Sequence, residues 1–230
     1  FRSPELGLRH RREKLFFTGD CLRRAFRIGL PMGCERIIMC GAQIMSTVIV
    51  APLGIYAIAA NAFAITAESL CYMPGYGIAD AATTLVGQSL GAKRHDLARS
   101  FARITVVMGM AVMTVMGAIM YLAAPLMIGV MTPVPEVVSL GVSILRIEAF
   151  AEPMFAAAIV AYGVFIGAGD TLVPATMNFV SIWAVRLTLA ALLAPSMGLH
   201  GVWIAMCIEL CFRGMIFLAR MKWGRWIKRL

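Results

Sequence analysis

Charged side chains are scarce in this sequence. Only 14% of its 230 residues are Asp, Glu, Lys or Arg, whereas 60% are hydrophobic. Soluble domains carry roughly 25% charged and about 45–50% apolar residues, and a chain of this length cannot bury such an apolar surplus in its interior. The shortage of charge therefore excludes an ordinary soluble domain and predicts a protein whose outer surface faces lipid.

The residues that usually perform chemistry are also few. The three histidines, His10, His95 and His200, all fall at the edges of long apolar stretches. No Ser/His/Asp set, zinc-ligand spacing or glycine-rich phosphate loop is present. The six cysteines form no C-x-x-C pair, and we expect them to act as small buried apolar residues. The sequence therefore predicts neither an enzyme nor a protein with a cofactor.

Acidic residues are outnumbered, with 12 Asp and Glu against 21 Lys and Arg, which gives a formal net charge of +9. Such an excess is common in nucleic-acid-binding proteins. Here, however, the basic residues cluster between apolar stretches that are long enough to cross a bilayer. This distribution argues against a nucleic-acid partner and for a lipid bilayer.

Apolar stretches of membrane-spanning length recur six times along the chain. A spanning helix needs about 20 mostly apolar residues, and breaks rich in Pro, Gly and polar residues separate the stretches. The predicted spans are 28–52, 55–90, 100–131, 137–167, 171–195 and 199–220. The predicted fold class is an all-α membrane protein with six transmembrane helices.

The basic residues predict which ends of the spans face the cytoplasm. Seventeen of the 21 lie in the leading segment, in the connection between the second and third spans, or in the tail. The positive-inside rule places all three in the cytoplasm, and an even number of spans brings both ends there. We divide the chain into a basic amphipathic cytoplasmic segment (1–27), which anchors to anionic lipid, a six-helix transmembrane lobe (28–220) and a basic cytoplasmic tail (221–230).

Ionisable residues inside the spans are costly and mark functional sites by default. The candidates for cation coupling or substrate binding are Glu35, Glu68, Glu148, Glu152 and Arg186. A carboxyl group withdrawn from water takes up a proton or Na⁺ near neutral pH, as a cation-coupled carrier requires. Glu148 and Glu152 are four residues apart, on one face of a continuous helix. Alternatively, the glutamates pair with Arg36, Arg146 or Arg186 and only hold the helices together.

The last span carries Glu209 and Arg213, four residues apart and close to its predicted cytoplasmic end. A pair with this spacing near an interface satisfies itself or reaches water. We therefore give this pair no part in the predicted site.

The second span is too long for a straight crossing, since its 36 residues would reach about 54 Å. Pro74-Gly75-Tyr76-Gly77 lies near its centre, where a proline removes a backbone donor and clashes with the preceding turn. We expect the helix to bend here, as a break that lines a polar cleft. The residues assigned to this break are Pro74, Gly75, Gly77 and Asp80.

Several short motifs occur in an order and spacing that resemble the C-terminal lobe of MATE (multidrug and toxic compound extrusion) transporters. The resemblance covers nearly the whole chain after residue 25. The motifs are Gly29-Leu30-Pro31, Pro74-Gly75 through Val86-Gly87-Gln88 and Gly91-Ala92, Gly167-Ala168-Gly169-Asp170-Thr171 with Pro174 and Asn178, and Gly198-Leu199 with Gly201-Val202-Trp203.

This resemblance implies a carrier of two six-helix lobes around a central cleft that opens alternately to each side of the plasma (bacterial inner) membrane. Small, often cationic drug-like compounds would leave in exchange for Na⁺ or H⁺, with Na⁺ bound at the glutamates if it is the coupling ion. Asn61 matches a polar position that lines the cleft in relatives. The chain opens at Phe1 without a start methionine or signal peptide, so we interpret it as a fragment whose partner is an N-terminal six-helix lobe of the same protein.

Two other interpretations stay open. A lipid-linked oligosaccharide flippase of the same superfamily would favour more basic residues in the cleft, where only Arg36, Arg146 and Arg186 are candidates. A membrane assembly subunit without transport activity is the third possibility. The sequence does not distinguish Na⁺ from H⁺, nor one substrate from another.

Overall fold

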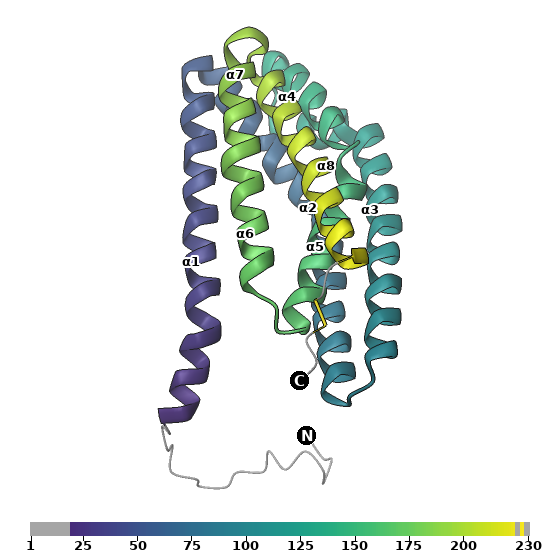
Figure 1. The fold of residues 1–230 in the computed structure, drawn as a ribbon. Coiled ribbons are helices and arrows are strands. Elements are labelled where there is room, and N and C mark those ends of the chain that lie inside the picture. The colour runs from purple at the N-terminus through teal and green to yellow at the C-terminus, as the bar shows by residue number, and fades with distance from the viewer. Residues whose placement is uncertain (1–18, 224–225, 228–230) are drawn as a thin grey trace, which may run out of the picture.

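Every secondary-structure element in the described part of the chain is a helix. The computed structural model describes residues 19–223 and 226–227, without the side chains of several residues between 20 and 35. Most of the predicted surface segment 1–27 therefore lies outside the described residues. The elements are α1 (Gly19–Val50), the short turn η2 (Ala51–Leu53), α2 (Ile55–Gly91), α3 (His95–Met131), α4 (Pro135–Glu148), α5 (Glu152–Gly167), α6 (Leu172–Val180), η3 (Ser181–Arg186), α7 (Leu187–Met197) and α8 (Leu199–Trp223) (Figure 1).

These helices provide five or six candidate membrane crossings. Five stretches are long and apolar enough to span a bilayer by length and composition, and the pair α4–α5 makes a sixth if it counts as one bent span. The start of α1 and the turn between α2 and α3 lie at one end of the molecule, and the turn between α7 and α8 lies at the other (Figure 1). The all-α, multi-span fold class is therefore confirmed.

The fourth span is interrupted, although the sequence predicts one continuous helix over 137–167. α4 and α5 meet at an angle of 59° across residues 149–151. Pro153 stands in the first turn of α5, where it lacks the N–H that would continue the ladder from α4 and disfavours helical backbone in the residue before it. Glu148 and Glu152 therefore lie on either side of a break, not on one face of a continuous helix.

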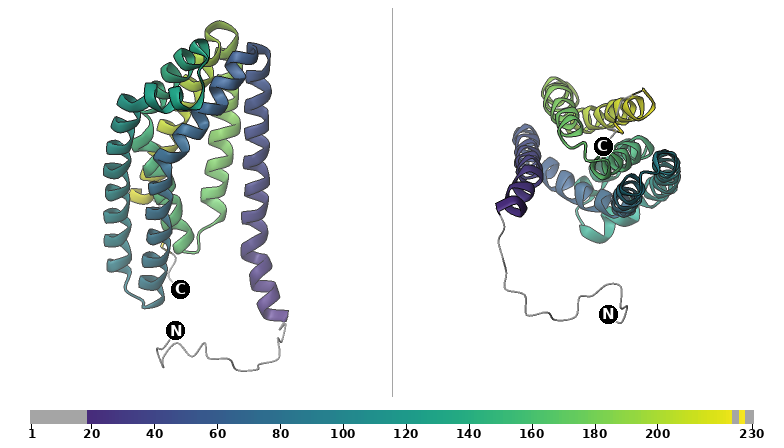
Figure 2. Two further views of the ribbon diagram at one scale, coloured as in Figure 1. Left: turned by 180° about the vertical axis from the view of Figure 1, so that it is seen from behind. Right: turned by 60° about the horizontal axis from the view of Figure 1, so that its bottom comes forward.

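The second span is continuous, which corrects the predicted break at Pro74. α2 runs without interruption from Ile55 to Gly91, with Pro74 inside it. The helix accommodates the proline by changing direction, as the two halves of α2 show in Figure 2. Gly75 is buried against α3, where an added Cβ would meet the Met113 side chain.

Small residues bring α2 and α5 close together. Gly163 faces the backbone of Ala79 so closely that an added Cβ would lie 2.5 Å from the Ala79 carbonyl oxygen. The Thr83 hydroxyl donates a hydrogen bond across the same contact to the Gly163 carbonyl at 2.8 Å. Such close approach is typical of helix packing in membranes, and it fixes α5 as the centre of the bundle.

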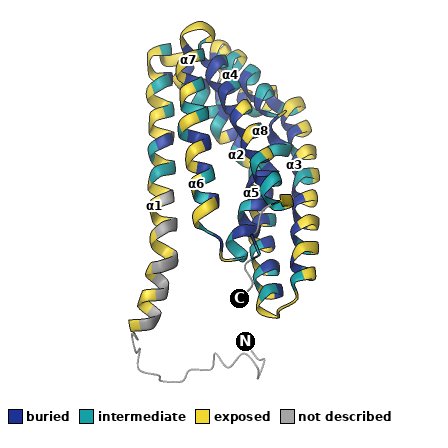
Figure 3. Ribbon diagram, viewed as in Figure 1, coloured by how far each residue is buried: buried dark blue, intermediate teal, exposed yellow. Residues whose placement is uncertain are grey.

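α1 packs mainly against α6 and α7 and leaves much of its surface uncovered (Figure 3). In contrast, α5 contacts α2, α3 and α8, and its residues Ala156–Ala161 are all buried. The core of the described fold therefore lies around α5.

Candidate functional site

A central cavity of about 280 Å³ lies between α1, α2, α5, α6 and α8. Its lining combines apolar and aromatic side chains with several polar ones. The polar and aromatic lining residues are Arg36, Tyr76, Asp80, Thr83, Phe155, Tyr162, Asn178 and Arg213. A mostly apolar concavity with a few placed polar groups is typical of a small-molecule site.

Four buried glutamates from four helices form an acidic cluster next to this cavity. Its members are Glu68 of α2, Glu148 of α4, Glu152 of α5 and Glu209 of α8, which are 5%, 1%, 1% and 0% exposed. Glu148 interacts electrostatically with all three of the others. The bend in the fourth span contributes to this arrangement, because it delivers one carboxylate from each of its two halves.

Glu148 and Glu152 are the unusual members of the acidic cluster. Within the described part of the chain, no group forms a hydrogen bond with either carboxylate oxygen of these two residues. A buried ionised carboxylate without a partner costs several kcal/mol or more, so this state needs a bound proton or cation to be stable. The two side chains are therefore suited to take up such an ion.

Two arginines compensate part of the negative charge. Arg213 Nε lies 3.1 Å from Glu209 Oε1, an ion pair within α8, although the N–H does not point at the oxygen as in a hydrogen bond. Arg186 interacts electrostatically with Glu68 and Glu148. Four carboxylates against two guanidinium groups leave two negative charges uncompensated when every glutamate is ionised.

Arg213 connects the acidic cluster to the central cavity. Its guanidinium contacts Glu209 on one side and lies over the Phe155 ring, 5.5 Å from the ring centre, on the other. Both Arg213 and Phe155 line the cavity. A change in the charge of the acidic cluster therefore changes the electrostatic potential at the cavity wall.

A stretch of π-helix in the fifth span supports Glu209. η3 (Ser181–Arg186) separates α6 from α7, and wide turns of this kind are frequent at functional sites. Ser181 at its start is fully buried and donates a hydrogen bond of 2.6 Å to Glu209 Oε1. Arg186 at its end approaches Met206 of α8.

Several predicted site residues occur in this region. Glu68, Glu148 and Glu152 come together, and Arg186 lies beside them. Asp80 lines the cavity, whereas the lining does not include Pro74, Gly75 or Gly77. The side chain of Glu35 lies outside the described residues.

Asn61, which the resemblance assigned to the cleft, contacts α8 in the structure. Its side-chain oxygen accepts a hydrogen bond of 3.0 Å from the Trp203 indole of α8. Asn61 is absent from the lining of the central cavity. A buried indole N–H needs an acceptor, and this hydrogen bond connects α2 to α8.

Glu209 and Arg213 do not form the interfacial pair that their spacing predicts. Both are buried, and both belong to the site. Their depth was available from the sequence, because Glu209 follows Gly198 by eleven residues, or about 17 Å of helix. That distance places it well inside the bilayer.

A preformed metal site is not present within residues 19–223 and 226–227. No three His, Cys, Asp or Glu side chains converge there closely enough to hold a metal ion. The four glutamates are electrostatic neighbours, but they would have to move closer together to surround Na⁺.

A multi-span helical bundle with a cavity and buried, uncompensated carboxylates is a membrane protein with an intramembrane polar site. The MatE family model matches residues 31–192, which is more than half of the chain. This chain belongs to the MatE family, and it is a multi-pass membrane protein related to multidrug efflux transporters.

Individual relatives agree with this assignment. A probable multidrug resistance protein NorM of Thermotoga maritima is 29% identical over 211 residues, covering 90% of this chain and 45% of the relative. The bent form of the Vibrio cholerae MATE transporter VcmN superimposes with a TM-score of 0.83 at 19% identity, covering 89% of this chain and 47% of that one. The MATE transporter ClbM in complex with Rb⁺ gives 0.82 at 19% identity, covering 90% and 50%. The chain thus spans about half the length of the relatives it matches.

Proposed function

We propose that the complete protein is a cation-coupled antiporter that exports small, often cationic organic compounds by alternating access, and that this chain supplies its C-terminal half. The observation that carries the proposal is the buried acidic cluster, whose Glu148 and Glu152 have no hydrogen-bond partner among the described residues. The plasma membrane is the proposed location, with the basic α2–α3 connection in the cytoplasm.

Charge balance supports cation coupling. Full ionisation of the acidic cluster leaves two negative charges in a medium of low polarity, which is unfavourable. A proton or Na⁺ would remove this imbalance, so the cluster would bind such an ion on one side of the membrane and release it on the other. The solved relative ClbM, whose structure was determined with Rb⁺, is in line with a monovalent cation as an alternative to the proton.

The position of Arg213 supports exchange in opposite directions. While the acidic cluster is ionised, Glu209 compensates the charge of Arg213, and a cationic compound can bind in the cavity. When a cation neutralises the cluster, the charge of Arg213 is less compensated and repels a positively charged substrate in the same cavity. Ion entry would therefore favour substrate release, as antiport requires.

Proteoliposomes containing the complete transporter test this proposal. We expect an imposed gradient of either protons or Na⁺ to drive transport of a cationic dye against its own gradient, and the effective gradient identifies the coupling ion. Empty liposomes and an ionophore that collapses the gradient are the controls. Failure of both gradients to move any cationic dye would refute the proposed function.

A further inference from the structure

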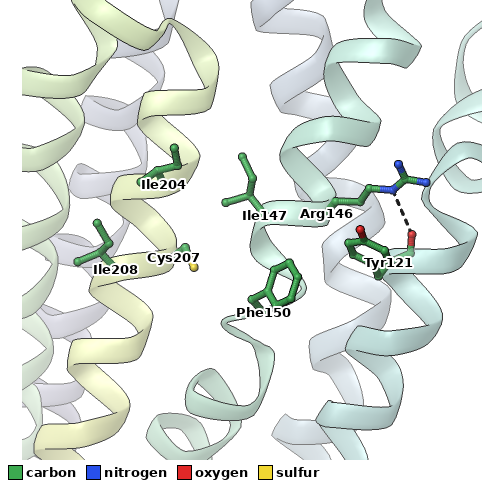
Figure 4. Close-up of a pocket in the computed structure, with 7 residues that line it drawn as sticks. All are labelled: Tyr121, Arg146, Ile147, Phe150, Ile204, Cys207 and Ile208. Carbon is green, nitrogen blue, oxygen red and sulfur yellow. Dashed lines mark hydrogen bonds between the residues drawn. The ribbon is translucent and has the colours of Figure 1, made fainter.

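Arg146 is an ionisable residue of the fourth span that the acidic cluster does not use. It lies two residues before the buried Glu148, but its side chain extends toward α3 (Figure 4). Its Nε donates a hydrogen bond of 3.4 Å to the Tyr121 carbonyl, and its guanidinium lies 5.2 Å from the centre of the Tyr121 ring. Within the described part of the chain, no carboxylate forms an ion pair with it.

An open groove of about 320 Å³ adjoins Arg146 at the break between α4 and α5. Ile147 and Phe150 form one wall, and Ile204 and Ile208 of α8 form the other (Figure 4). Phe150 is 73% exposed and packs edge-to-face on Tyr121, with the ring centres 5.8 Å apart. The groove shares no lining residue with the central cavity.

The surroundings of Arg146 are those of a lipid-facing surface. On the neighbouring α3, the side chains between Tyr121 and the end of the helix remain apolar: Leu122, Leu126 and Val130 are 77%, 70% and 80% exposed. Arg146 therefore lies within the apolar band, where a cation without an anionic partner is costly.

The N-to-C direction of α4 determines which membrane surface lies nearer to the guanidinium. Arg146 follows Pro135 by eleven residues, or about 17 Å of helix. Side chains on a helix lean toward its N-terminus, so Arg146 extends toward the surface nearer Pro135, at the end of the molecule opposite the α2–α3 turn. At this depth the guanidinium lies below the headgroups of that leaflet, so a phosphate reaches it only where the bilayer thins locally, as bilayers do around an intramembrane arginine.

We propose that this groove binds one membrane phospholipid, with its phosphate on Arg146 and an acyl chain between Phe150 and Ile208. A phosphodiester offers the acceptor oxygens that match the guanidinium fork, and the apolar walls accommodate a hydrocarbon chain. A free inorganic anion would leave the apolar walls unused. The bound lipid would cover the break in the fourth span and bridge α4 to α8.

Photo-crosslinking in the complete transporter tests this site. Vesicles of phosphatidylethanolamine and phosphatidylglycerol would contain a trace of phosphatidylglycerol with a diazirine on one acyl chain, or the diacylglycerol with the same chains. Peptide mass spectrometry would quantify adducts on Ile147–Phe150 and Ile204–Ile208, relative to adducts on the exposed α3 residues 104, 107 and 108.

We expect the phosphatidylglycerol probe to label the groove about tenfold more than the diacylglycerol probe, a ratio that corresponds to about 1.4 kcal/mol. Arg146→Gln should lower the labelling by phosphatidylglycerol about tenfold, and Arg146→Lys should keep it within about threefold, because a lysine still provides a cation. Arg103→Gln, a change at an exposed arginine of α3, should leave it unaltered.

Equal labelling of the unaltered protein by the two probes would overturn the proposal, as would undiminished labelling of a folded Arg146→Gln variant. The comparison of the two probes needs no substitution, so the test stands even when Arg146→Gln fails to fold. It is also independent of transport, because neither probe depends on an ion gradient or a drug.

Discussion

Single residues determine the chemistry of the buried acidic cluster. The rule that charges inside spans are functional found Glu68, Glu148 and Glu152 from the sequence, because each stands in an apolar run too long to be a loop. It did not find the cavity residues Tyr76 and Tyr162. The packing between helices determines which side of a helix faces a cavity. The residues around these two tyrosines show no local pattern that would indicate it.

Replacing Glu152 with glutamine should reduce ion-driven dye transport at least about tenfold, because the amide keeps the shape but cannot exchange a proton or bind a cation with a full charge. Initial rates in proteoliposomes, at equal protein incorporation, measure the effect. Glu136→Gln is the matched control, since Glu136 is exposed in the first turn of α4. Unchanged coupled transport by Glu152→Gln would assign Glu152 a structural role.

Ser181 is predicted to stabilise Glu209. Ser181→Ala removes a buried hydrogen bond of 2.6 Å to a carboxylate, and such bonds contribute about 1.5–3 kcal/mol. The unfolding temperature of the detergent-solubilised complete protein should therefore fall. Ser196→Ala removes an exposed hydroxyl that bonds only within its own helix, and it should change stability by less than about 0.5 kcal/mol. Equal effects of the two changes would contradict this role for Ser181.

Helices and their breaks show where sequence reasoning succeeds and fails. Apolar runs bounded by Pro and Gly predicted the five long apolar helices and the bent α4–α5 pair, because a bilayer demands long apolar helices. Proline alone did not locate the break: Pro74 lies inside a continuous helix, whereas Pro153 begins a new one. The difference depends on neighbouring helices, since a span that packs on both sides of a proline can bend and remain continuous.

The contact between α2 and α5 should be intolerant of a single methyl group. Gly163→Ala places a Cβ against the backbone of Ala79, which cannot rotate away, and we expect a loss of about 1–3 kcal/mol in thermal unfolding. Gly77→Ala on α2 meets no atom within 4 Å and should be neutral or stabilise the helix by up to about 1 kcal/mol. A Gly163→Ala protein as stable as the parent would show that the two helices approach less closely than described.

At the scale of the whole molecule, this chain supplies only part of the wall around the central cavity. The central cavity is lined on one side by α1, a helix with much exposed apolar surface, and the chain spans about half of its relatives. We therefore predict that this half alone, reconstituted in liposomes, does not transport a dye under either gradient. Transport by the isolated half at the rate of the complete protein would contradict the two-lobe arrangement.

The most direct test of the buried acidic cluster as the coupling site is ion release on substrate binding. Purified complete transporter should release protons or Na⁺ when a cationic dye binds, as measured with a pH indicator or a Na⁺ electrode. The double variant Glu148→Gln/Glu152→Gln should bind the dye yet release neither ion, while Glu136→Gln should behave like the parent. Ion release by the double variant equal to that of the parent would contradict the central role of these two glutamates.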